Sequence, residues 1–293
     1  MIIAEVAGGL ANQMIIYAAA RALAIHKNVE LKLDLSALNK DKTYKYYLHN
    51  LNISAELASP DEIAKIRQSS KMKIVEKIKN KLRKKLKIKV PYIYREPLCS
   101  YDDSFWSLPD DVYIGGNFIS TKYFDKINDI LIKEFAVKTA LSSKTEEVCE
   151  TIKNCESVSI HVRRGDFASN PHTNEFHGLV DVDYYSRAIK YIESHVPNPS
   201  YFLFSDNLEW ARENIKSEQP IIFVDHVRQD DAYEDMHLMK HCKHNILANS
   251  GFGLFGARLN ENSQKIVIAP KKWFANEEMN ALLDLIPKEW IRL

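Results

Sequence analysis

Apolar and polar positions alternate most regularly after residue 156. Short apolar runs alternate there with longer segments whose apolar residues recur at every third or fourth position, which predicts strands separated by helices. Strands are expected at 157–162, 201–205, 221–224, 244–248 and 265–268, and helices at 183–195, 207–215, 231–242 and 252–259. Such βαβ units form a parallel sheet with helices on both faces, so the fold class is α/β.

The first residues predict a second unit of the same kind. A strand, a glycine turn and an alanine-rich helix are expected over 1–6, 7–10 and 12–26. Further strands are expected at 29–35 and 112–118, with a polar, mainly helical stretch at 40–91 between them. A chain of 293 residues has room for two domains, which we place at 1–155 and 156–293.

Composition narrows the class of protein. Hydrophobic residues make up 45% of the chain and charged residues 27%, which excludes disordered and fibrous classes. The four cysteines form no Cys-x-x-Cys pair, so neither a disulfide framework nor a zinc ribbon is indicated and a cytoplasmic protein is expected. The N-terminal segment has neither the basic start of a signal peptide nor the length of a membrane span.

Side chains suited to binding phosphate directly follow the predicted strands, where parallel α/β sheets bind ligands. The residues that follow three of these strands are Arg163-Arg164-Gly165-Asp166, Ser205-Asp206 and Asn249-Ser250-Gly251. Guanidinium groups bind phosphate bidentately, and backbone amides at helix N-termini point the same way. A pair of arginines can also be a surface ion-pair site, but its place after a buried strand favours a phosphorylated or nucleotide ligand.

Four blocks of the chain carry a family resemblance. They are GGLANQM at 8–14, HVRRGDF at 161–167, FLFSDNLEWA at 202–211 and DMHLMKHCKHNILANSGFGLFGARLN at 235–260. HVRRGDF is similar to the H-x-R-R-x-D motif shared by α1,2-, α1,6- and protein O-fucosyltransferases. With the other three blocks in the same order and spacing, the chain resembles bacterial α1,2-fucosyltransferases of glycosyltransferase family 11.

The resemblance implies a GT-B architecture, with two Rossmann-like domains facing a cleft. The C-terminal domain would hold GDP-fucose and the N-terminal domain would shape the acceptor site. The resemblance also implies inverting transfer that needs no metal, so we expect no cofactor. The donor-binding residues that we expect are Gly8, Gly9, Asn12, Gln13, His161, Arg164, Ser205, Asp206, Asn249 and Ser250.

Two residues are assigned to the chemical step. Arg163 matches the first arginine of the family's pair and is expected to stabilise charge on the departing β-phosphate. Asp166 is the first candidate for the base that deprotonates the acceptor hydroxyl, although it could instead cap the loop and orient Arg163. Glu5 is the second candidate. His161 is expected to position the loop rather than to carry a proton.

In the N-terminal block, Gly8 and Gly9 would let the backbone approach the pyrophosphate, while Asn12 and Gln13 donate from the first helical turn. A plain tight turn is the alternative.

The departures from the family pattern lie in the last block. Leu254, Phe255 and Arg258 replace the tryptophans of S-W-W-G-A-W. These changes bear on acceptor choice more than on donor binding, because Asn249 and Ser250 are retained.

The polar segment at 168–179 carries His172 and His177 and directly follows the phosphate motif. It is expected to be a loop. Either it contacts the acceptor, or it is simply solvated.

Three patterns typical of other chemistry are set aside. The D-x-D at 181–183, a metal signature, precedes a predicted helix, so Asp183 is expected to be its N-cap. The HCKH at 241–244 contains metal-ligand types but has no second ligand pair at the right spacing, and a structural role is expected. The G-x-G-x-x-G at 251–256 lacks the acid that would bind a ribose.

These observations predict an enzyme that transfers L-fucose from GDP-fucose to the 2-hydroxyl of a β-galactoside. The acceptor is expected to be a lipid-linked, bacterial O-antigen-type glycan precursor. Two alternatives stay open: a non-catalytic sugar-nucleotide or glycan-binding protein of the same fold, and an NAD-dependent oxidoreductase that uses 251–256.

The charge of the chain is unevenly distributed. Ten lysines and arginines against one glutamate give the run at 71–89 a net +9, which leaves −8 elsewhere in a chain of net +1. A general nucleic-acid binder would spread its basic charge, so nucleic acid is not expected as a partner. Apolar residues recur in the run at helical spacing, which predicts either a solvated helix or a helix that docks on anionic lipid at the inner membrane face.

Overall fold

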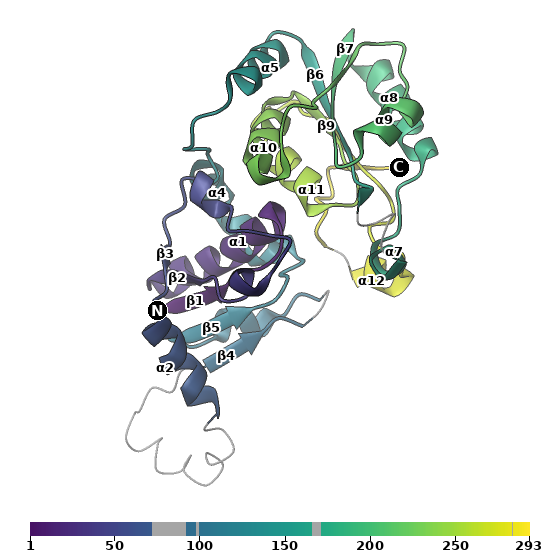
Figure 1. The fold of residues 1–293 in the computed structure, drawn as a ribbon. Coiled ribbons are helices and arrows are strands. Elements are labelled where there is room, and N and C mark those ends of the chain that lie inside the picture. Colours follow the sequence, from purple (N-terminus) through teal and green to yellow (C-terminus); the bar gives the residue numbers. More distant parts are fainter. Residues whose placement is uncertain (72–91, 98–99, 166–170, 283) are drawn as a thin grey trace. The chain divides into compact units, whose positions relative to one another are not determined.

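The computed structural model describes residues 1–71, 92–97, 100–165, 171–282 and 284–293. They form two compact units, which we call the N-terminal unit (Met1–Phe135) and the C-terminal unit (Ala136–Leu293). Each unit is built around one parallel sheet, so the predicted α/β class with two Rossmann-like units is confirmed (Figure 1). Within the described ranges, no helix combines the length and the apolar character needed to cross a bilayer.

The sheet of the N-terminal unit has the strand order β3-β2-β1-β5-β4, and every neighbouring pair is parallel. Its strands are β1 (Ile2–Glu5), β2 (Leu31–Asp34), β3 (Glu56–Leu57), β4 (Tyr92–Arg95) and β5 (Val112–Gly115). The central position of β1 explains its sequence: Ile2, Ile3 and Ala4 are fully buried, as expected for a strand covered on both faces.

The helices of the N-terminal unit are α1 (Leu10–Lys27), α2 (Pro60–Lys71) and α4 (Asn128–Glu134), with short 3₁₀ turns between them. Most of the alanines of α1 are buried, and the helix packs on β1 and β2. The helix ends at Asn28, whose left-handed φ of 53° lets its backbone N–H bond the carbonyls of the last turn.

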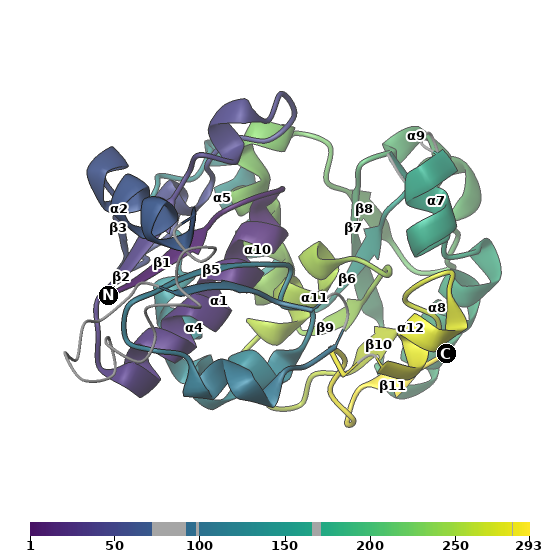
Figure 2. The ribbon, with the colours of Figure 1, turned by 90° about the horizontal axis from the view of Figure 1, so that it is seen from below.

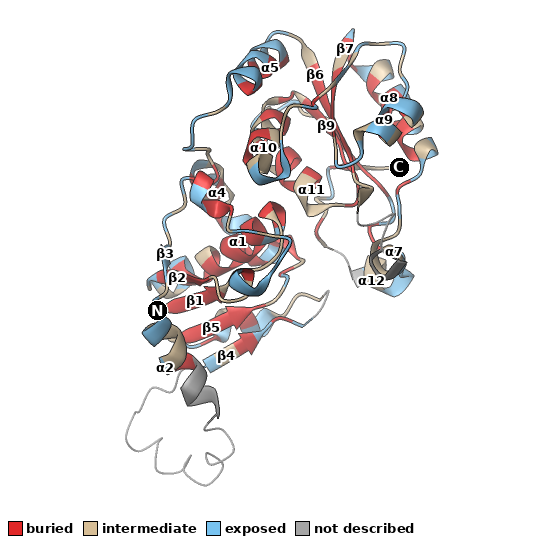
Figure 3. Ribbon diagram, viewed as in Figure 1, coloured by how far each residue is buried: buried red, intermediate tan, exposed pale blue. Residues whose placement is uncertain are grey.

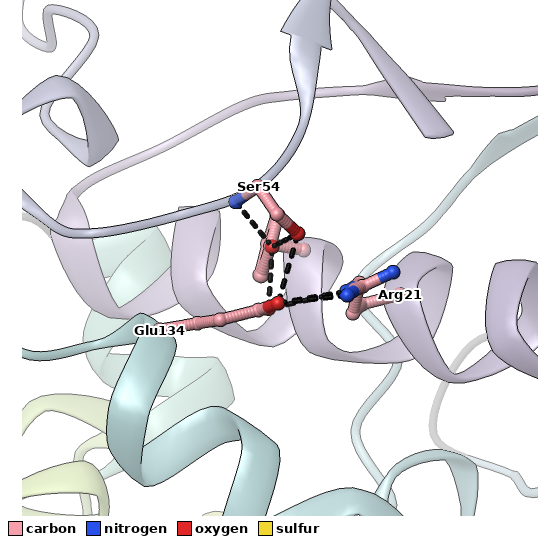
Figure 4. A network of polar contacts seen from close by, with 4 residues as sticks. Arg21, Ser54 and Glu134 are labelled. Carbon is pink, nitrogen blue, oxygen red and sulfur yellow. Dashed lines mark hydrogen bonds and ion pairs between the residues drawn. The ribbon is translucent and has the colours of Figure 1, made fainter. Parts of the chain in front are cut away.

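A buried polar network links separate elements of this unit (Figure 4). Glu134, the last residue of α4, accepts hydrogen bonds from Tyr17 Oη at 2.6 Å and from Ser54 Oγ at 2.8 Å. Arg21 donates to the same carboxylate at 2.9 and 3.0 Å. These bonds satisfy the buried carboxylate, and they join α1, α4 and the segment around Ser54.

The sheet of the C-terminal unit has the strand order β11-β10-β9-β6-β7-β8, again with parallel neighbours. Its strands are β6 (Glu156–Val162), β7 (Pro199–Ser205), β8 (Ile221–Phe223), β9 (His244–Ile246), β10 (Val267–Ala269) and β11 (Ile291–Arg292). All five strands predicted here from the apolar runs are present, within two residues at each end.

Helices cover both faces of this sheet (Figures 2 and 3). They are α5 (Ser143–Lys153), α7 (Pro171–His177), α8 (Val182–His195), α9 (Leu208–Asn214), α10 (Ala232–His241), α11 (Gly251–Arg258) and α12 (Glu277–Leu282). Tyr201 and Leu203 of β7 pack with α8 and α9, whereas Phe202 and Phe204 pack with α5 and α10. Because successive side chains of β7 point to opposite faces of the sheet, they pack in two separate cores.

The boundary between the units differs from the predicted one. It lies after Phe135 rather than after residue 155, because α5 belongs to the C-terminal unit. Val148, Cys149 and Ile152 of α5 are buried in the core that contains Phe202 and Leu238.

The structure also bears on three shorter segments. Residues 171–177 form α7, so the predicted loop at 168–179 is wrong over that stretch. The N-cap of α8 is Asp181, which accepts from the backbone N–H of Tyr184 at 2.7 Å, and not Asp183. The basic run at 71–89 lies outside the described residues, apart from Lys71 at the end of α2.

Candidate functional site

The candidate site of the C-terminal unit lies at the carboxyl ends of β6, β7 and β9. These three strands are neighbours in a parallel sheet, so the segments that follow them emerge at one edge. The segments are 163–165, 205–207 and 249–251. The structure therefore brings most of the post-strand residues predicted in this unit to the same edge.

Asp206 connects the segments after β6 and β7. Its Oδ2 lies 3.0 Å from Nη1 of Arg163, and its Oδ1 accepts from the backbone N–H of Arg164 at 2.8 Å. The Arg163 side chain is 29% exposed, so the ion pair orients the guanidinium while leaving part of it open to solvent. Asp206 thus orients Arg163, whereas Asp166 lies outside the described residues and both of its candidate roles stay predictions.

Gly165 makes this arrangement sterically possible. A Cβ atom at Gly165 would lie 2.5 Å from Oδ2 of Asp206 and 3.0 Å from its Cγ. Any side chain here would push away the carboxylate that holds Arg163. The glycine of HVRRGDF is therefore a packing requirement of the ion pair.

Arg164 points onto an aromatic ring. Its guanidinium carbon lies 3.9 Å from the centroid of the Trp210 ring, a cation–π stack. Trp210 lies in the first turn of α9, whose N-cap Asn207 accepts from the Trp210 N–H at 3.1 Å. Sequence reasoning missed Trp210. The signal was its position four residues after Asp206 in the second block.

His161 is buried beneath this edge as a neutral imidazole. Burial lowers its pKa to about 4; the Asp206 carboxylate opposes this shift and the Arg163 charge adds to it. The ring packs on Phe252, and a Cβ at Gly253 would lie 2.8 Å from its Nδ1. This packed position agrees with a residue that positions the loop.

Asn249 and Ser250 hold neighbouring segments together. The Asn249 amide donates to the carbonyls of His177 at 2.9 Å and Trp273 at 3.1 Å. Ser250 is the N-cap of α11 and accepts from the Phe252 N–H at 3.3 Å. Ser205 likewise accepts from the Asn207 N–H at 3.0 Å. These contacts place all three side chains at the predicted edge, and their contact with a donor stays a prediction.

The two histidines predicted to meet an acceptor lie in α7. The His177 ring packs between Phe176 and Phe274, with centroid distances of 4.7 and 5.9 Å. The side chain of His172 lies outside the described part of the chain. The acceptor role of both residues stays a prediction.

The glycine turn of the N-terminal unit follows β1. Gly8 has a left-handed φ of 73°, and Asn12 is exposed one turn later. Gln13 is fully buried: its Nε2 donates to the carbonyls of Gly8 and Lys45, and its Oε1 accepts from the N–H of Tyr47. Both amide hydrogens are thus used within the unit, so the Gln13 side chain holds the glycine turn against the segment at 45–47, and its contact with a donor stays a prediction.

Glu5, the second candidate base, ends β1. It forms an ion pair with Arg95 of β4, and Arg95 also lies over the Tyr113 ring. The carboxylate is thus fixed by a cation of its own unit.

The residues that replace the family tryptophans are mostly core residues. Leu254 and Phe255 are fully buried in α11, whereas Arg258 is half-buried. The first two changes therefore alter the packing of the C-terminal unit rather than its surface.

One acid with an enclosed carboxylate oxygen was not singled out from the sequence. Burial, followed by the charge of Glu234, raises the pKa of Asp235 to about 7, and its Oδ1 is enclosed without a hydrogen-bond partner among the described residues. Asp235 opens the last matching block, so the signal was its place in that motif.

Comparison with known proteins extends over the whole chain. The family model described as "Glycosyl transferase family 11" matches residues 1–293. The O-antigen biosynthesis glycosyltransferase WbnK of Escherichia coli is 30% identical, covering 98% of both chains. An alpha-1,2-colitosyltransferase of the same species is 29% identical, covering 100% of this chain and 99% of that protein.

More distant proteins share parts of the sequence or the fold. The galactoside 2-alpha-L-fucosyltransferase SEC1 of Bos taurus is 22% identical over 56% of this chain and 48% of its own length. The structure of an Arabidopsis thaliana FUT1 mutant with GDP superposes with a TM-score of 0.51 at 12% identity, covering 92% of this chain and 70% of that one. At this identity the likeness bears on the fold alone.

Proposed function

This chain belongs to glycosyl transferase family 11, and from that premise we propose that it is an α1,2-fucosyltransferase. It moves L-fucose from GDP-fucose to the 2-hydroxyl of a β-galactoside in an O-antigen-type precursor, with inversion and without a metal ion. Full-length similarity to an O-antigen glycosyltransferase and partial similarity to a galactoside 2-fucosyltransferase support this choice.

The observation that carries the proposal is the Arg163–Asp206 pair. Displacement at the anomeric carbon of fucose leaves negative charge on the β-phosphate of GDP. A guanidinium already oriented by a carboxylate stabilises that charge without reorganising during the reaction. Arg164, stacked on Trp210, adds positive charge at the same edge.

A carboxylate is also needed to take the proton of the acceptor hydroxyl. Asp166 remains our first candidate, since it follows the arginine pair directly in the sequence. Glu5 is the weaker candidate, because Arg95 already holds its carboxylate.

Colitose is the second candidate for the transferred sugar. One full-length relative carries that sugar in its name, and its similarity to this chain is almost the same as that of the O-antigen glycosyltransferase. GDP-colitose is therefore the donor to compare with GDP-fucose.

The test is a transfer assay in the presence of EDTA. The protein is incubated with a β-galactoside and either GDP-fucose or GDP-colitose, and both GDP release and glycosylated product are measured. Product with GDP-fucose, of inverted anomeric configuration, is expected. Calorimetric binding of GDP without turnover on any β-galactoside would instead identify a non-catalytic sugar-nucleotide-binding protein.

We further propose that the acceptor is lipid-linked and that the protein works at the inner face of the plasma membrane. The net charge of +9 in the run 71–89 supports this proposal. Co-sedimentation of the full chain with anionic vesicles at low salt, lost at high salt and absent with neutral vesicles, is the expected result.

A further inference from the structure

A cluster of three metal-ligand side chains lies in the C-terminal unit, in residues that the proposed transfer does not use. Cys149 comes from α5, whereas His237 and His241 come from α10. Their potential ligand atoms all lie within 4.8 Å of one another. Sequence reasoning sets His241 aside with residues 242–244, but the fold joins it to a histidine one turn earlier and to a cysteine 88 residues before that histidine.

We propose that Cys149, His237 and His241 form a binding site for one Zn²⁺ ion, with a water molecule as the fourth ligand. Two imidazoles and one thiolate are a donor set that zinc favours, and histidines at positions i and i+4 share one face of a helix.

The spacing of the ligands fits this ion. Tetrahedral zinc with Zn–S near 2.3 Å and Zn–N near 2.0–2.1 Å requires an S–N separation of about 3.6 Å and an N–N separation of about 3.3 Å. Sγ of Cys149 lies 3.8 Å from Nε2 of His237. This separation is therefore close to that of a tetrahedral site, and the other ligand atoms, all within 4.8 Å of one another, would move closer when the ion binds.

The hydrogen bond of His241 gives independent support. Its Nδ1 lies 2.7 Å from the carbonyl oxygen of His237, and because a carbonyl can only accept, Nδ1 carries the proton. The lone pair is thus on Nε2. Metal-binding histidines usually donate their other N–H in this way, which fixes the tautomer and the ring.

The relative position of α5 and α10 is fixed by an apolar core and by a hydrogen-bonded contact. Cys149, Val148 and Ile152 of α5 pack in a core with Leu238 and Met239 of α10. At the start of α5, buried Glu234 accepts from Ser142 Oγ at 2.7 Å and from the Ser142 N–H at 3.0 Å. A site supported by rigid elements needs little ordering when the ion binds.

Binding would exchange a proton for the metal. The Sγ–H bond of Cys149 breaks, the proton goes to solvent, and an Sγ–Zn bond forms. The ion would cross-link α5 to α10 and stabilise the C-terminal unit, and it plays no part in the transfer step.

The test uses the full-length protein, stripped with a chelator and dialysed. Native mass spectrometry and titration of ZnCl₂ against a chromophoric competitor are expected to give one tightly bound zinc ion per chain. Co²⁺ is expected to produce a thiolate-to-metal charge-transfer band. Zinc should also raise the temperature of unfolding.

Matched variants locate the site. Cys149→Ser should abolish the charge-transfer band and stoichiometric zinc binding, and His241→Gln should abolish stoichiometric binding. Cys155→Ser, at another thiol of the same unit, and His195→Gln, at a histidine of α8, should bind like the wild type.

Two results would overturn the proposal: a wild-type protein that binds no zinc stoichiometrically, or a Cys149→Ser protein that binds it as tightly as the wild type. Both leave an S–H···N contact between Cys149 and His237 as the role of the cluster. The wild-type measurements decide the question even if a variant fails to fold, and circular dichroism of the metal-free variants identifies that case.

Discussion

The carboxyl edges of the two sheets differ in chemistry although both sheets are parallel and α/β. In the C-terminal unit, Asp206 holds Arg163, and Arg164 extends over Trp210, so the edge presents two arginines. In the N-terminal unit, Glu5 pairs with Arg95, and fully buried Asp34 accepts from the Tyr113 hydroxyl at 2.7 Å. The C-terminal edge thus presents two arginines, whereas the N-terminal edge presents one arginine, paired with Glu5, and a second carboxylate that Tyr113 already binds.

This difference indicates which unit can stabilise a diphosphate by charge. A leaving phosphate needs fixed cations, and oriented arginines provide them in the C-terminal unit. What the N-terminal unit offers at its glycine turn is backbone, together with the exposed side chain of Asn12. On the proposed function, the same architecture thus supports two roles, and the side chains after the strands decide between them.

The strongest way to break this comparison is to remove the oriented cation. Arg163→Ala is expected to lower kcat by about 10²–10³-fold, the usual cost of losing one preorganised group that stabilises transition-state charge. Arg163→Lys should recover part of this loss, because lysine keeps the charge but not the bidentate geometry. GDP release and fucosylated product are measured at saturating donor.

The matched control is Arg187→Ala, which removes an exposed arginine paired with Asp183 on α8. It should retain wild-type turnover. Near-normal kcat in Arg163→Ala would show that the charge of this edge is not used in the reaction.

The next largest effect is expected from Gly165→Ala, which keeps every charge and changes only their geometry. The new Cβ would lie 2.5 Å from Oδ2 of Asp206, so the carboxylate must move and Arg163 with it. A misplacement of about 1 Å at a reacting group can cost about 10²-fold in rate. Steady-state kinetics should show a loss in kcat, with circular dichroism unchanged. Wild-type kcat in a folded Gly165→Ala protein would refute the geometric part of the argument.

These positions also show how far the sequence could be interpreted. The arginines and Asp206 were predictable because each directly follows a strand with an unmistakable apolar run. The buried hydrogen bonds of Gln13 were not predictable, because its partners at Lys45 and Tyr47 lie in a 3₁₀-containing segment without periodicity. The cluster of proposed zinc ligands could not be predicted for a related reason, because the packing of α5 on α10 brings together segments that are distant in the sequence.

Short strands and helices were the other features that the sequence could not predict. β3 and β11 have two residues each, too few for any alternation to be recognised. The segment 171–177 is polar, and its helix α7 is held by tertiary contacts such as the Asn249 bond to the His177 carbonyl. Asp181 and Asp183 both suit an N-cap, and only the backbone geometry distinguishes them.

A pH experiment sharpens the assignment of charge at the cationic edge. His161 has a folded pKa of about 4, below the unfolded value of about 6.5, so the unfolded chain binds a proton first as pH falls. Above pH 6.5 the residue adds no pH dependence. Between pH 6.5 and 4 it lowers stability by up to about 1.4 kcal/mol per pH unit.

Urea unfolding of the wild type and His161→Gln at several pH values isolates this effect. As pH falls through this window, the wild type should lose free energy of unfolding relative to the variant. Other shifted groups, such as His237 and Asp235, are present in both proteins and cancel in the difference. Parallel pH profiles would mean that His161 has the same pKa in the folded and unfolded chains, and would refute its burial as a neutral imidazole.

The smallest expected effect tests the backbone role of the N-terminal edge. Gly8 has a left-handed φ of 73°, which costs a residue with a Cβ about 1–2 kcal/mol, whereas Gly9 has an ordinary φ of −72°. Gly8→Ala should therefore lower the free energy of unfolding by about that amount, and Gly9→Ala by much less. If the turn presents its amides to the diphosphate, Gly8→Ala should also raise the KM for GDP-fucose more than it lowers kcat, the reverse of Arg163→Ala. Equal effects of Gly8→Ala on kcat and on KM would place both sheet edges in the chemical step and remove the distinction between them.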